Sequence, residues 1–509
     1  MSRAVSSLLV LVLASGGIGG LSAVTPPIPP DAILDHIKFL ASDELRGRGN
    51  GTEGLERAAD YIAAEFKETG LRPGGDGGSW FQPFELTIGV TVGDANRLVI
   101  RGAKQSVTLS LGTSYLPIAA TPSDAPVNIT GLPVVFAGYG ISAPDFKYDD
   151  YERLDVTGKA VLIFSHEPQE NRADSRLNGN RPLRETTVYA KAMAARTRGA
   201  RALIVVSDPS HRVDEVNYRA FLADADPEDH SIPVLRVQRD AVAPLIEELG
   251  LERLAMMIER DLVPRSQALP GVTLDYTQEL ATNRRTLRNV VGILPGADAA
   301  RDEEAVVLGG HYDHVGLGGR FSSSPDRTGE IHNGADDNAS GVAALIEIGR
   351  AAAADRSRFP RSLVFVAFAG EERGLFGSAH YANNPAIPMS DTIAMLNLDM
   401  IGRPRRGGVE VGGMATAQPL RAEVEGAGKV AGIDVRPSGI GAGRSDDASF
   451  LDKRVPALHL FTGFHDDYHR PTDDWQGIDA AGTARVATLA LELAARLAAR
   501  ADRLQFAAP

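Results

Sequence analysis

Residues 305–316 read AVVLGGHYDHVG, in which an apolar run ends abruptly in two histidines around an aspartate. The run Ala305–Leu308 is typical of a buried strand, and the side chains after it can hydrogen-bond, titrate and bind metals. Open α/β sheets place their ligands at the carboxyl ends of their strands. This stretch by itself leaves two alternatives open, a buried polar turn and a metal site.

Other apolar runs of the chain end in the same way. Acidic or imidazole side chains follow three of them: SLVFVAFAG (362–370) precedes Glu371 and Glu372, IAMLNL (393–398) precedes Asp399, and PALHLFTG (456–463) leads towards His465 and His469. Between the run Ala305–Leu308 and the run 362–370, NGADDNASG (333–341) is expected to form a tight turn before a helix. Because strands and helices alternate, the sheet should be mostly parallel, and the carboxyl ends of its strands should meet in one crevice.

The bulk composition limits the classes of protein that fit. A chain of 509 residues exceeds what one hydrophobic core usually organises, so two domains are expected. The net charge of -13 argues against a nucleic acid or an anionic membrane as partner. With no cysteine, the chain has no disulfide, no thiolate ligand and no cysteine nucleophile, so any metal must be held by His, Asp and Glu.

The amino end resembles a cleavable export signal. Arg3 precedes an apolar stretch, Leu8–Ala14, and a segment of small residues that closes at Ala23, before a proline-rich segment. The alternative is a membrane anchor, but the apolar core is far shorter than the roughly 20 residues that span a bilayer. The sequence therefore predicts a signal peptide at residues 1–23, no stable membrane anchor after cleavage, and a periplasmic or secreted protein.

Periodic patterns predict several elements outside the four strands. Thr52 begins an amphipathic helix with apolar positions at 55, 59, 62 and 66, which ends at Gly70. Further elements are predicted as strands at 133–140, 160–164 and 202–206, a helix at 188–198, a new run of strands from 288–296, and a closing helix at 483–504. A domain boundary is expected between Pro264 and Arg284.

The residues after the apolar runs are the kinds that bind zinc when thiolates are absent. Zinc takes imidazole nitrogen and carboxylate oxygen at about 2.0 to 2.2 Å, and two zinc ions about 3.5 to 4 Å apart need a bridging carboxylate. The motifs resemble the five metal-site motifs of the zinc aminopeptidases of peptidase family M28: His311-Tyr312-Asp313, Gly334–Gly341, Glu371-Glu372, Asn397-Leu398-Asp399 and Tyr468-His469. The match spans Ala305–Trp475, and residues 40–66 are also similar to the family's amino-terminal helices.

The resemblance implies a role for each of these positions. It places His311 and Asp399 on one zinc and Glu372 and His469 on the other, with Asp337 as the bridge. Asp337 is preferred over Asp336, the alternative, because it immediately precedes the Asn-Ala-Ser-Gly turn where the family's ligand lies.

Three further residues are assigned by the same resemblance and by the chemistry of metal sites. Glu371 is implied as the general base. Asp313 is predicted to fix the tautomer of the neighbouring metal-bound imidazole, and Tyr468 resembles the family's phenol that can hydrogen-bond the developing oxyanion. With this set complete, the remaining histidines near the motifs are predicted to serve packing or to lie at the surface: His314, His332, His380, His459 and His465.

A second resemblance covers the middle of the chain. Residues 134–163 and 191–209 carry a similarity to the protease-associated (PA) domain that is often inserted in this family. The predicted organisation is a signal peptide at 1–23, the first part of the catalytic domain at 24–124, the β-rich PA insert at 125–274, and the rest of the catalytic domain at 275–509. Whether the insert is a lid or docking wall for substrate, or a passive insert, stays open.

Together these observations predict an α/β fold with a mixed, mostly parallel sheet flanked by helices. The resemblance implies an exported zinc aminopeptidase that holds two Zn²⁺ per chain and hydrolyses peptides with a free amino terminus, through a zinc-bridged water activated by Glu371. Two alternative functions are less favoured. A single-zinc glutaminyl cyclase, an acyltransferase, is disfavoured by His311 and Asp337, and a non-catalytic receptor should have lost ligands, whereas none is missing here.

Overall fold

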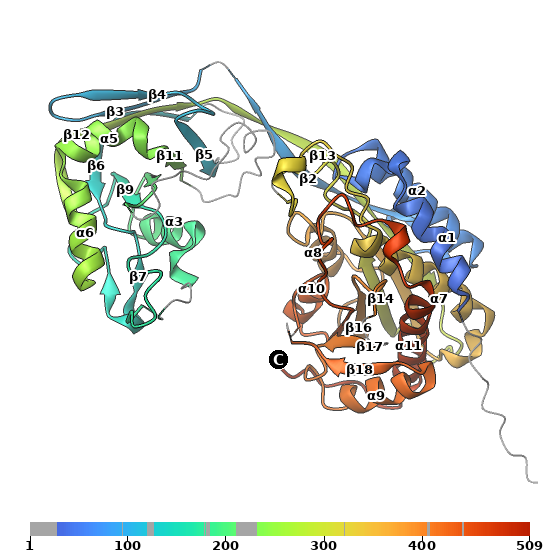
Figure 1. Ribbon diagram of the computed structural model, residues 1–509. Coiled ribbons are helices and arrows are strands. Elements are labelled where there is room, and N and C mark those ends of the chain that lie inside the picture. Colours follow the sequence, from blue (N-terminus) through green and yellow to red (C-terminus); the bar gives the residue numbers. More distant parts are fainter. Residues whose placement is uncertain are drawn as a thin grey trace, which may run out of the picture.

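The structure of the protein is a computed structural model that describes residues 28–93, 95–119, 127–177, 179, 184–209, 232–319, 321–404, 408–439 and 442–508. The described chain forms a larger lobe (residues 28–92 and 280–508) and a smaller lobe (residues 97–278), each with its own sheet (Figure 1). The predicted signal peptide, residues 1–23, lies outside the described residues. Among the described helices, none combines the length and the apolar character needed to cross a membrane.

The larger lobe is built on a mixed sheet of nine strands. Their order is β1 (Arg72–Pro73), β13 (Leu280–Leu294), β15 (Ser362–Phe368), β14 (Ala305–His311), β16 (Thr392–Leu398), β19 (Ala457–Phe461), β17 (Gly408–Gly412) and β18 (Asp434–Pro437), with β2 (Phe81–Val92) paired to β13. The four central strands β15, β14, β16 and β19 are parallel to their neighbours in this group. Their carboxyl ends therefore lie at one edge, which confirms the predicted mixed α/β architecture.

Helices cover both faces of this sheet. One face carries α1 (Pro30–Leu40), α2 (Glu53–Glu68), α7 (Gly341–Ala354), α9 (Leu420–Ala431) and α11 (Ala480–Ala499), and the other carries α8 (Phe376–Asn383) and α10 (Asp447–Asp452). Alternate residues of β14 serve the two cores, with Leu308 on the α7 side and Val307 on the α8 side. Because both faces are buried, the central strands are apolar at nearly every position.

The predicted amphipathic helix is α2. The hydroxyl of Thr52 accepts a hydrogen bond from the backbone amide of Leu55 at 3.4 Å and so caps the first turn. The apolar positions Leu55, Ala59, Ile62 and Phe66 are all buried. The predicted closing helix is α11, which packs against α1, α7 and α9.

The smaller lobe has an eight-stranded sheet of its own. The strand order is β4 (Ser106–Leu109), β3 (Arg97–Arg101), β12 (Gln267–Gln278), β6 (Val127–Phe136), β9 (Ala160–Phe164), β10 (Ala202–Val206), β11 (Val234–Val237) and β5 (Tyr115–Ala119). Helices α3 (Val188–Thr197), α5 (Arg239–Glu248) and α6 (Leu251–Asp261) pack against it, and the short strands β7 (Ser142–Ala143) and β8 (Tyr148–Asp149) pair with each other.

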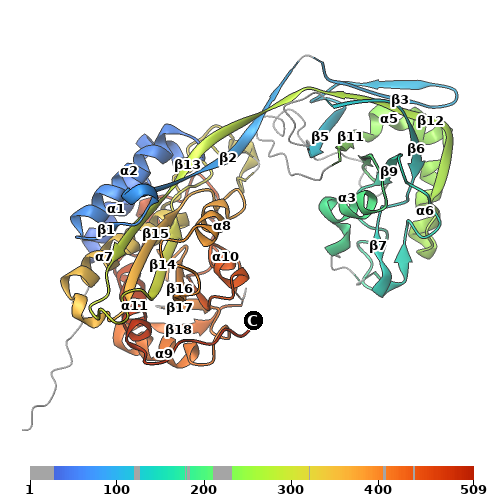
Figure 2. The same cartoon turned by 180° about the vertical axis from the view of Figure 1, so that it is seen from behind.

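The two lobes are joined by a long antiparallel strand pair. Strands β2 and β13 pair from Phe81 and Val290 to Val92 and Leu280 and lead from one lobe to the other (Figure 2). Strands β3 and β5 hydrogen-bond to β12 and β11 in the smaller sheet. We therefore propose that the smaller lobe begins near Arg97, earlier than the boundary expected at residue 125.

Candidate metal centre

The polar residues that follow the central strands come together in one cavity. Residue His311 ends β14, Glu371 and Glu372 follow β15, Asp399 follows β16, His469 lies in the loop after β19, and Asp337 lies in the segment Ala335–Ser340 before α7. All six line a single cavity, together with Tyr468. Seven of the eight residues proposed from the sequence thus share one cavity, and the eighth, Asp313, lies behind it.

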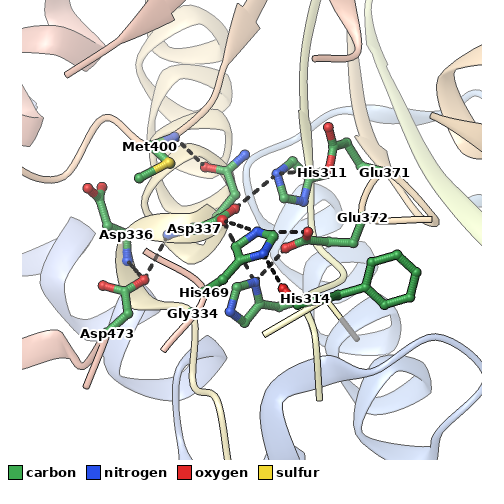
Figure 3. A network of polar contacts seen from close by, with 12 residues as sticks. His311, His314, Gly334, Asp336, Asp337, Glu371, Glu372, Met400, His469 and Asp473 are labelled. Carbon is green, nitrogen blue, oxygen red and sulfur yellow. Dashed lines mark hydrogen bonds and ion pairs between the residues drawn. The ribbon is translucent and has the colours of Figure 1, made fainter. Parts of the chain in front are cut away.

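Asp337 lies between two histidines that belong to different parts of the chain. One carboxylate oxygen, Oδ1, is 3.3 Å from Nε2 of His311, and the other, Oδ2, is 3.1 Å from Nε2 of His469 (Figure 3). The two oxygens of one side chain therefore face two separate imidazoles.

Further donor atoms gather around each imidazole. Nε2 of His311 is 3.3 Å from Oδ1 of Asp399 and 3.9 Å from Oε2 of Glu371. Nε2 of His469 is 3.0 Å from Oε2 of Glu372. Two groups result, and in each the donor atoms lie within 4.8 Å of one another: His311, Glu371 and Asp399 in the first, and His314, Asp337, Glu372 and His469 in the second. Such spacing of imidazole and carboxylate groups suits a metal ion beside each histidine.

The charge of the cluster is unbalanced. Burial lowers the pKa of His469, but Glu372 and Asp337 outweigh it and raise the pKa to about 11. Burial likewise lowers the pKa of His311, and the charges of Asp399 and Glu371 raise it well above its ordinary value. Burying several carboxylates together is costly unless positive charge accompanies them. The cluster therefore favours a cation at both histidines.

Glu371 and Glu372 have opposite pKa shifts. Burial raises the pKa of Glu371 well above its usual range, and although His311 lowers it, Glu372 raises it again. Burial and Asp337 also raise the pKa of Glu372, but His469 and His314 outweigh them and lower it to about 2. A pair whose environments separate the two pKa values in this way suits two different tasks, proton transfer and charge binding.

Of the two consecutive aspartates, only Asp337 faces the metal centre. Oδ1 of Asp336 accepts hydrogen bonds from the backbone amide of Gly402 at 2.6 Å and from the hydroxyl of Ser340 at 3.1 Å. Its Oδ2 is 3.2 Å from Nε2 of His465. Asp336 therefore holds neighbouring loops together and points away from the cluster (Figure 3).

Asp313 acts on the cluster in a different way from the one expected. Nδ1 of His311 is 3.1 Å from the backbone carbonyl oxygen of Asp313 and 3.8 Å from its carboxylate, so the carbonyl is the nearer acceptor. The carboxylate instead accepts hydrogen bonds from the backbone amides of Glu371 at 3.1 Å and Glu372 at 3.3 Å, and from the side-chain amide of Asn50 at 2.7 Å. By accepting hydrogen bonds from these two backbone amides, the Asp313 carboxylate fixes the turn after β15 that carries both glutamates.

Tyr468 packs directly on a member of the cluster. Its ring stacks on His469 with a centroid distance of 3.9 Å and meets Phe464 edge-on at 4.9 Å. Burial, followed by the charges of Asp337 and Glu372, raises the pKa of Tyr468 far above its ordinary value. The phenol therefore stays protonated and can donate a hydrogen bond inside the cavity.

Two residues of this region were not assigned to the metal centre from the sequence. His314, expected at the surface or in packing, is buried in the second group with Nδ1 2.7 Å from Oε1 of Glu372. Arg48 is fully buried and donates to the backbone carbonyl oxygens of four residues: Tyr312 at 2.8 Å, Asn333 at 2.7 Å, Gly334 at 2.9 Å, and Leu40. It thereby ties the loop after β14 to the loop before Asp337. The repeated histidine in His-x-Asp-His was a signal for the first of these residues, and nothing comparable marked the second.

Comparisons with known proteins identify two domains and several similar proteins. Residues 289–494 match the profile of Peptidase family M28, and residues 129–245 match the PA domain. A probable zinc metalloprotease of Pyrenophora tritici-repentis (strain Pt-1C-BFP) is 36% identical over 118 residues, which cover 23% of this chain and 25% of that protein. Aminopeptidase YwaD of Bacillus subtilis (strain 168) is 25% identical over 298 residues, which cover 58% of this chain and 50% of that protein.

A solved structure is similar over nearly the whole length. The aminopeptidase from Aneurinibacillus sp. strain AM-1 aligns with a TM-score of 0.58 at 20% identity, covering 95% of this chain and 97% of that one, and at this identity the likeness is one of fold. The sequence matches to the two curated relatives span about a quarter and half of their lengths. The M28 match lies within the larger lobe and the PA match lies within the smaller lobe, so the chain contains a Peptidase family M28 domain and a PA domain.

Proposed function

We propose that the protein is an exported aminopeptidase that uses two zinc ions per chain. The observation that carries the proposal is the position of Asp337, whose two oxygens face His311 and His469 at 3.3 and 3.1 Å. The donor set of buried imidazole nitrogens and carboxylate oxygens fits zinc. His311 and Asp399 would hold one ion, Glu372 and His469 the other, and Asp337 both.

The chemistry of peptide hydrolysis divides among the residues of the cavity. When bound, the two zinc ions supply Lewis acidity that polarises a carbonyl and makes water a stronger acid. Glu371, whose pKa is raised by burial, accepts a proton from the attacking water and returns it to the departing amine. The phenol of Tyr468 donates a hydrogen bond to the oxyanion that develops on the scissile carbonyl. Asp313 keeps the turn that carries Glu371 in place.

The proposed substrate is a peptide with a free amino terminus. This is supported by the aminopeptidase named among the relatives and by the apolar residues that line part of the cavity. Beside the metal centre, apolar side chains line the same cavity, namely Met400, Phe461 and Phe464, and they suit the side chain of the first residue. Export rests on residues 1–23, which have the composition of a signal peptide.

A glutaminyl cyclase with one zinc is the less favoured function. Its single metal would leave one of the two groups of donors without a purpose, yet both groups are complete and Asp337 faces both.

An assay of the purified protein with aminoacyl chromogenic amides tests the proposal. We expect hydrolysis of an amide with a free amino group, loss of the activity after treatment with a chelator, and its return on adding zinc. The matched control substrate is the same amide with an acetylated amino group, which should resist hydrolysis. Equal rates on both substrates, or an activity unaffected by the chelator, would contradict a zinc aminopeptidase. Cyclisation of a peptide with amino-terminal glutamine would favour the alternative.

A further inference from the structure

We infer that His314 is a positioning residue that holds Glu372 so that one carboxylate oxygen faces the metal centre and the other faces away. The inference rests on the proposed function, because it concerns how one of the two metal ions would be held.

The two oxygens of Glu372 have different partners. Oε1 is 2.7 Å from Nδ1 of His314, and Oε2 is 3.0 Å from Nε2 of His469. An ionised carboxylate can only accept hydrogen bonds, so Nδ1 of His314 is the donor in this 2.7 Å contact. One oxygen is therefore occupied by a hydrogen bond, and the other remains available at the centre.

The distances place His314 behind the metal centre. The atoms proposed to surround the second ion are close to one another, with Nε2 of His469 within 3.1 Å of both Asp337 and Glu372. Nδ1 of His314 is 4.0 Å from Oδ2 of Asp337, and its short contact is to the far oxygen of Glu372. This pattern is the one expected of a residue that supports a ligand and does not bind the ion itself.

The surroundings of His314 leave its ring little freedom. The side chain is buried, its ring meets that of His469 edge-on at 5.5 Å, and a Cβ at Gly334 would lie 2.5 Å from its ring carbon Cδ2. Its Nε2 has no hydrogen-bond partner among the described residues. A buried polar ring is costly unless it makes good contacts. The contact with Glu372 is the one hydrogen bond that this ring makes within the described part of the chain, so the position of the ring and that of the carboxylate depend on each other.

The hydrogen bond from His314 should affect the binding of only one of the two ions. A Glu372 that presents one fixed oxygen can bind the ion beside His469 and leave it room for a further ligand. Hydrogen bonds to metal ligands are typically worth about 10- to 100-fold in metal affinity. Loss of the His314 hydrogen bond should therefore lower the affinity for that ion. The affinity for the ion beside His311 should be unaffected.

Zinc titration of the metal-free protein against a competing chromophoric chelator tests this. We expect two zinc ions to bind the wild-type protein. In His314→Leu, the affinity for one of them should fall by about 10- to 100-fold, while the affinity for the other changes by less than about twofold. His314→Asn should recover most of the affinity, because its amide nitrogen occupies a position close to that of Nδ1 and can donate to Oε1.

The matched control is another buried histidine that pairs with a glutamate. Nε2 of His36 is 3.1 Å from Oε1 of Glu347, away from the cavity. His36→Leu should lower the melting temperature, as His314→Leu does, but leave both zinc affinities unchanged. A selective loss in His314→Leu that His36→Leu does not share would support positioning over a general loss of packing. The same loss in both variants, or wild-type affinities in His314→Leu, would overturn the inference.

Cobalt distinguishes support from direct coordination. With Co²⁺ in place of zinc, the d–d absorption reports the number and kind of ligands. We expect the spectrum of His314→Asn to match that of the wild type, and a changed spectrum at full loading would make His314 a ligand and overturn the inference. A wild-type protein that binds fewer than two metal ions would contradict the proposed function itself, whereas two ions with unchanged affinities in His314→Leu would contradict this inference alone.

Discussion

Glu371 and Glu372 are neighbours in the chain, but their carboxylates face different histidines. Oε2 of Glu371 is 3.9 Å from Nε2 of His311, and Oε2 of Glu372 is 3.0 Å from Nε2 of His469. The pKa of Glu371 is raised by burial, whereas that of Glu372 is lowered to about 2, against the effect of burial, chiefly by His469. The first therefore suits proton transfer and the second suits metal binding.

The variant Glu371→Gln should separate chemistry from metal binding. It keeps the shape of the side chain but removes the proton acceptor, so we expect kcat to fall by roughly 10² to 10⁴ while the zinc content stays near two and stability hardly changes. Steady-state kinetics and elemental analysis of the same preparation provide the measurement. A variant that retains more than about a tenth of the wild-type kcat would show that Glu371 is not the base.

The variant Glu372→Gln is the matched contrast. It exchanges a charged ligand for a weak neutral one, and metal sites depend on deprotonated ligands, so it should lose zinc on dialysis as well as activity. Zinc content after dialysis, measured beside Glu371→Gln, is the test. If Glu372→Gln kept two zinc ions and Glu371→Gln lost one, the two roles would be assigned the wrong way round.

Removal of the smaller lobe should affect long substrates more than the chemistry. Among the described residues, none of those that line the metal cavity comes from this lobe. Val92 and Leu280 are paired in β2 and β13, so a two-residue Asn-Gly turn can replace residues 93–279 and close the strand pair as a hairpin.

We expect this shortened protein to lose more kcat/KM on long peptides than on a small aminoacyl amide. The two rates, each relative to the full chain, are compared on one preparation whose zinc content is two. Equal losses on both substrates would contradict a role of the smaller lobe in binding substrate.

The stability of the smaller lobe should depend on pH through Asp150. Burial raises the pKa of this carboxyl to about 7, although the backbone amides of Ile141 and Tyr139 and the hydroxyl of Tyr148 lower it. The folded lobe then binds this proton more tightly than the unfolded chain does. The contribution of Asp150 to the stability of the lobe should therefore be fully present below about pH 4, and it should be lost as the pH rises towards 7.

Asp150→Asn isolates this contribution, because other groups titrate equally in both proteins. We expect the difference in unfolding free energy between variant and wild type to shift by roughly 1 to 4 kcal/mol in favour of the variant between pH 4.5 and 7. Chemical denaturation of the full chain at several pH values, followed at the transition of the smaller lobe, gives this difference. A difference that does not change with pH would show that Asp150 titrates normally.

The main elements of the larger lobe were predictable because they depend on local patterns. The strands that carry His311, Glu371 and Asp399 are buried on both faces, so they read as continuous apolar runs, and the polar residues after them mark the carboxyl ends of the strands. Once these strands are parallel, their ends must meet. The placement of Asp337 rather than Asp336 at the cluster agrees with its position before the Asn-Ala-Ser-Gly turn.

The parts that the sequence did not reveal depend on contacts between distant segments. Three of the backbone carbonyls to which Arg48 donates, those of Tyr312, Asn333 and Gly334, belong to residues more than 260 positions away, and a carbonyl carries no signal in the sequence. The role of His314 depends on where the second oxygen of Glu372 points, 58 residues further on. The pairing of β3 with β12 likewise joins segments whose local patterns do not indicate each other as partners.

The zinc content of Asp337→Ala, compared with that of the wild type and of His311→Ala, tests the central claim most directly. If Asp337 bridges two ions, the wild-type protein should hold about two zinc ions per chain. His311→Ala should keep the ion beside His469 and lose the other. Asp337→Ala should lower the affinity for both ions. Elemental analysis after dialysis against a weak chelator gives the three values. Two tightly held ions in Asp337→Ala, or one ion in the wild type with no gain in activity on adding zinc, would contradict a dinuclear centre bridged by this carboxylate.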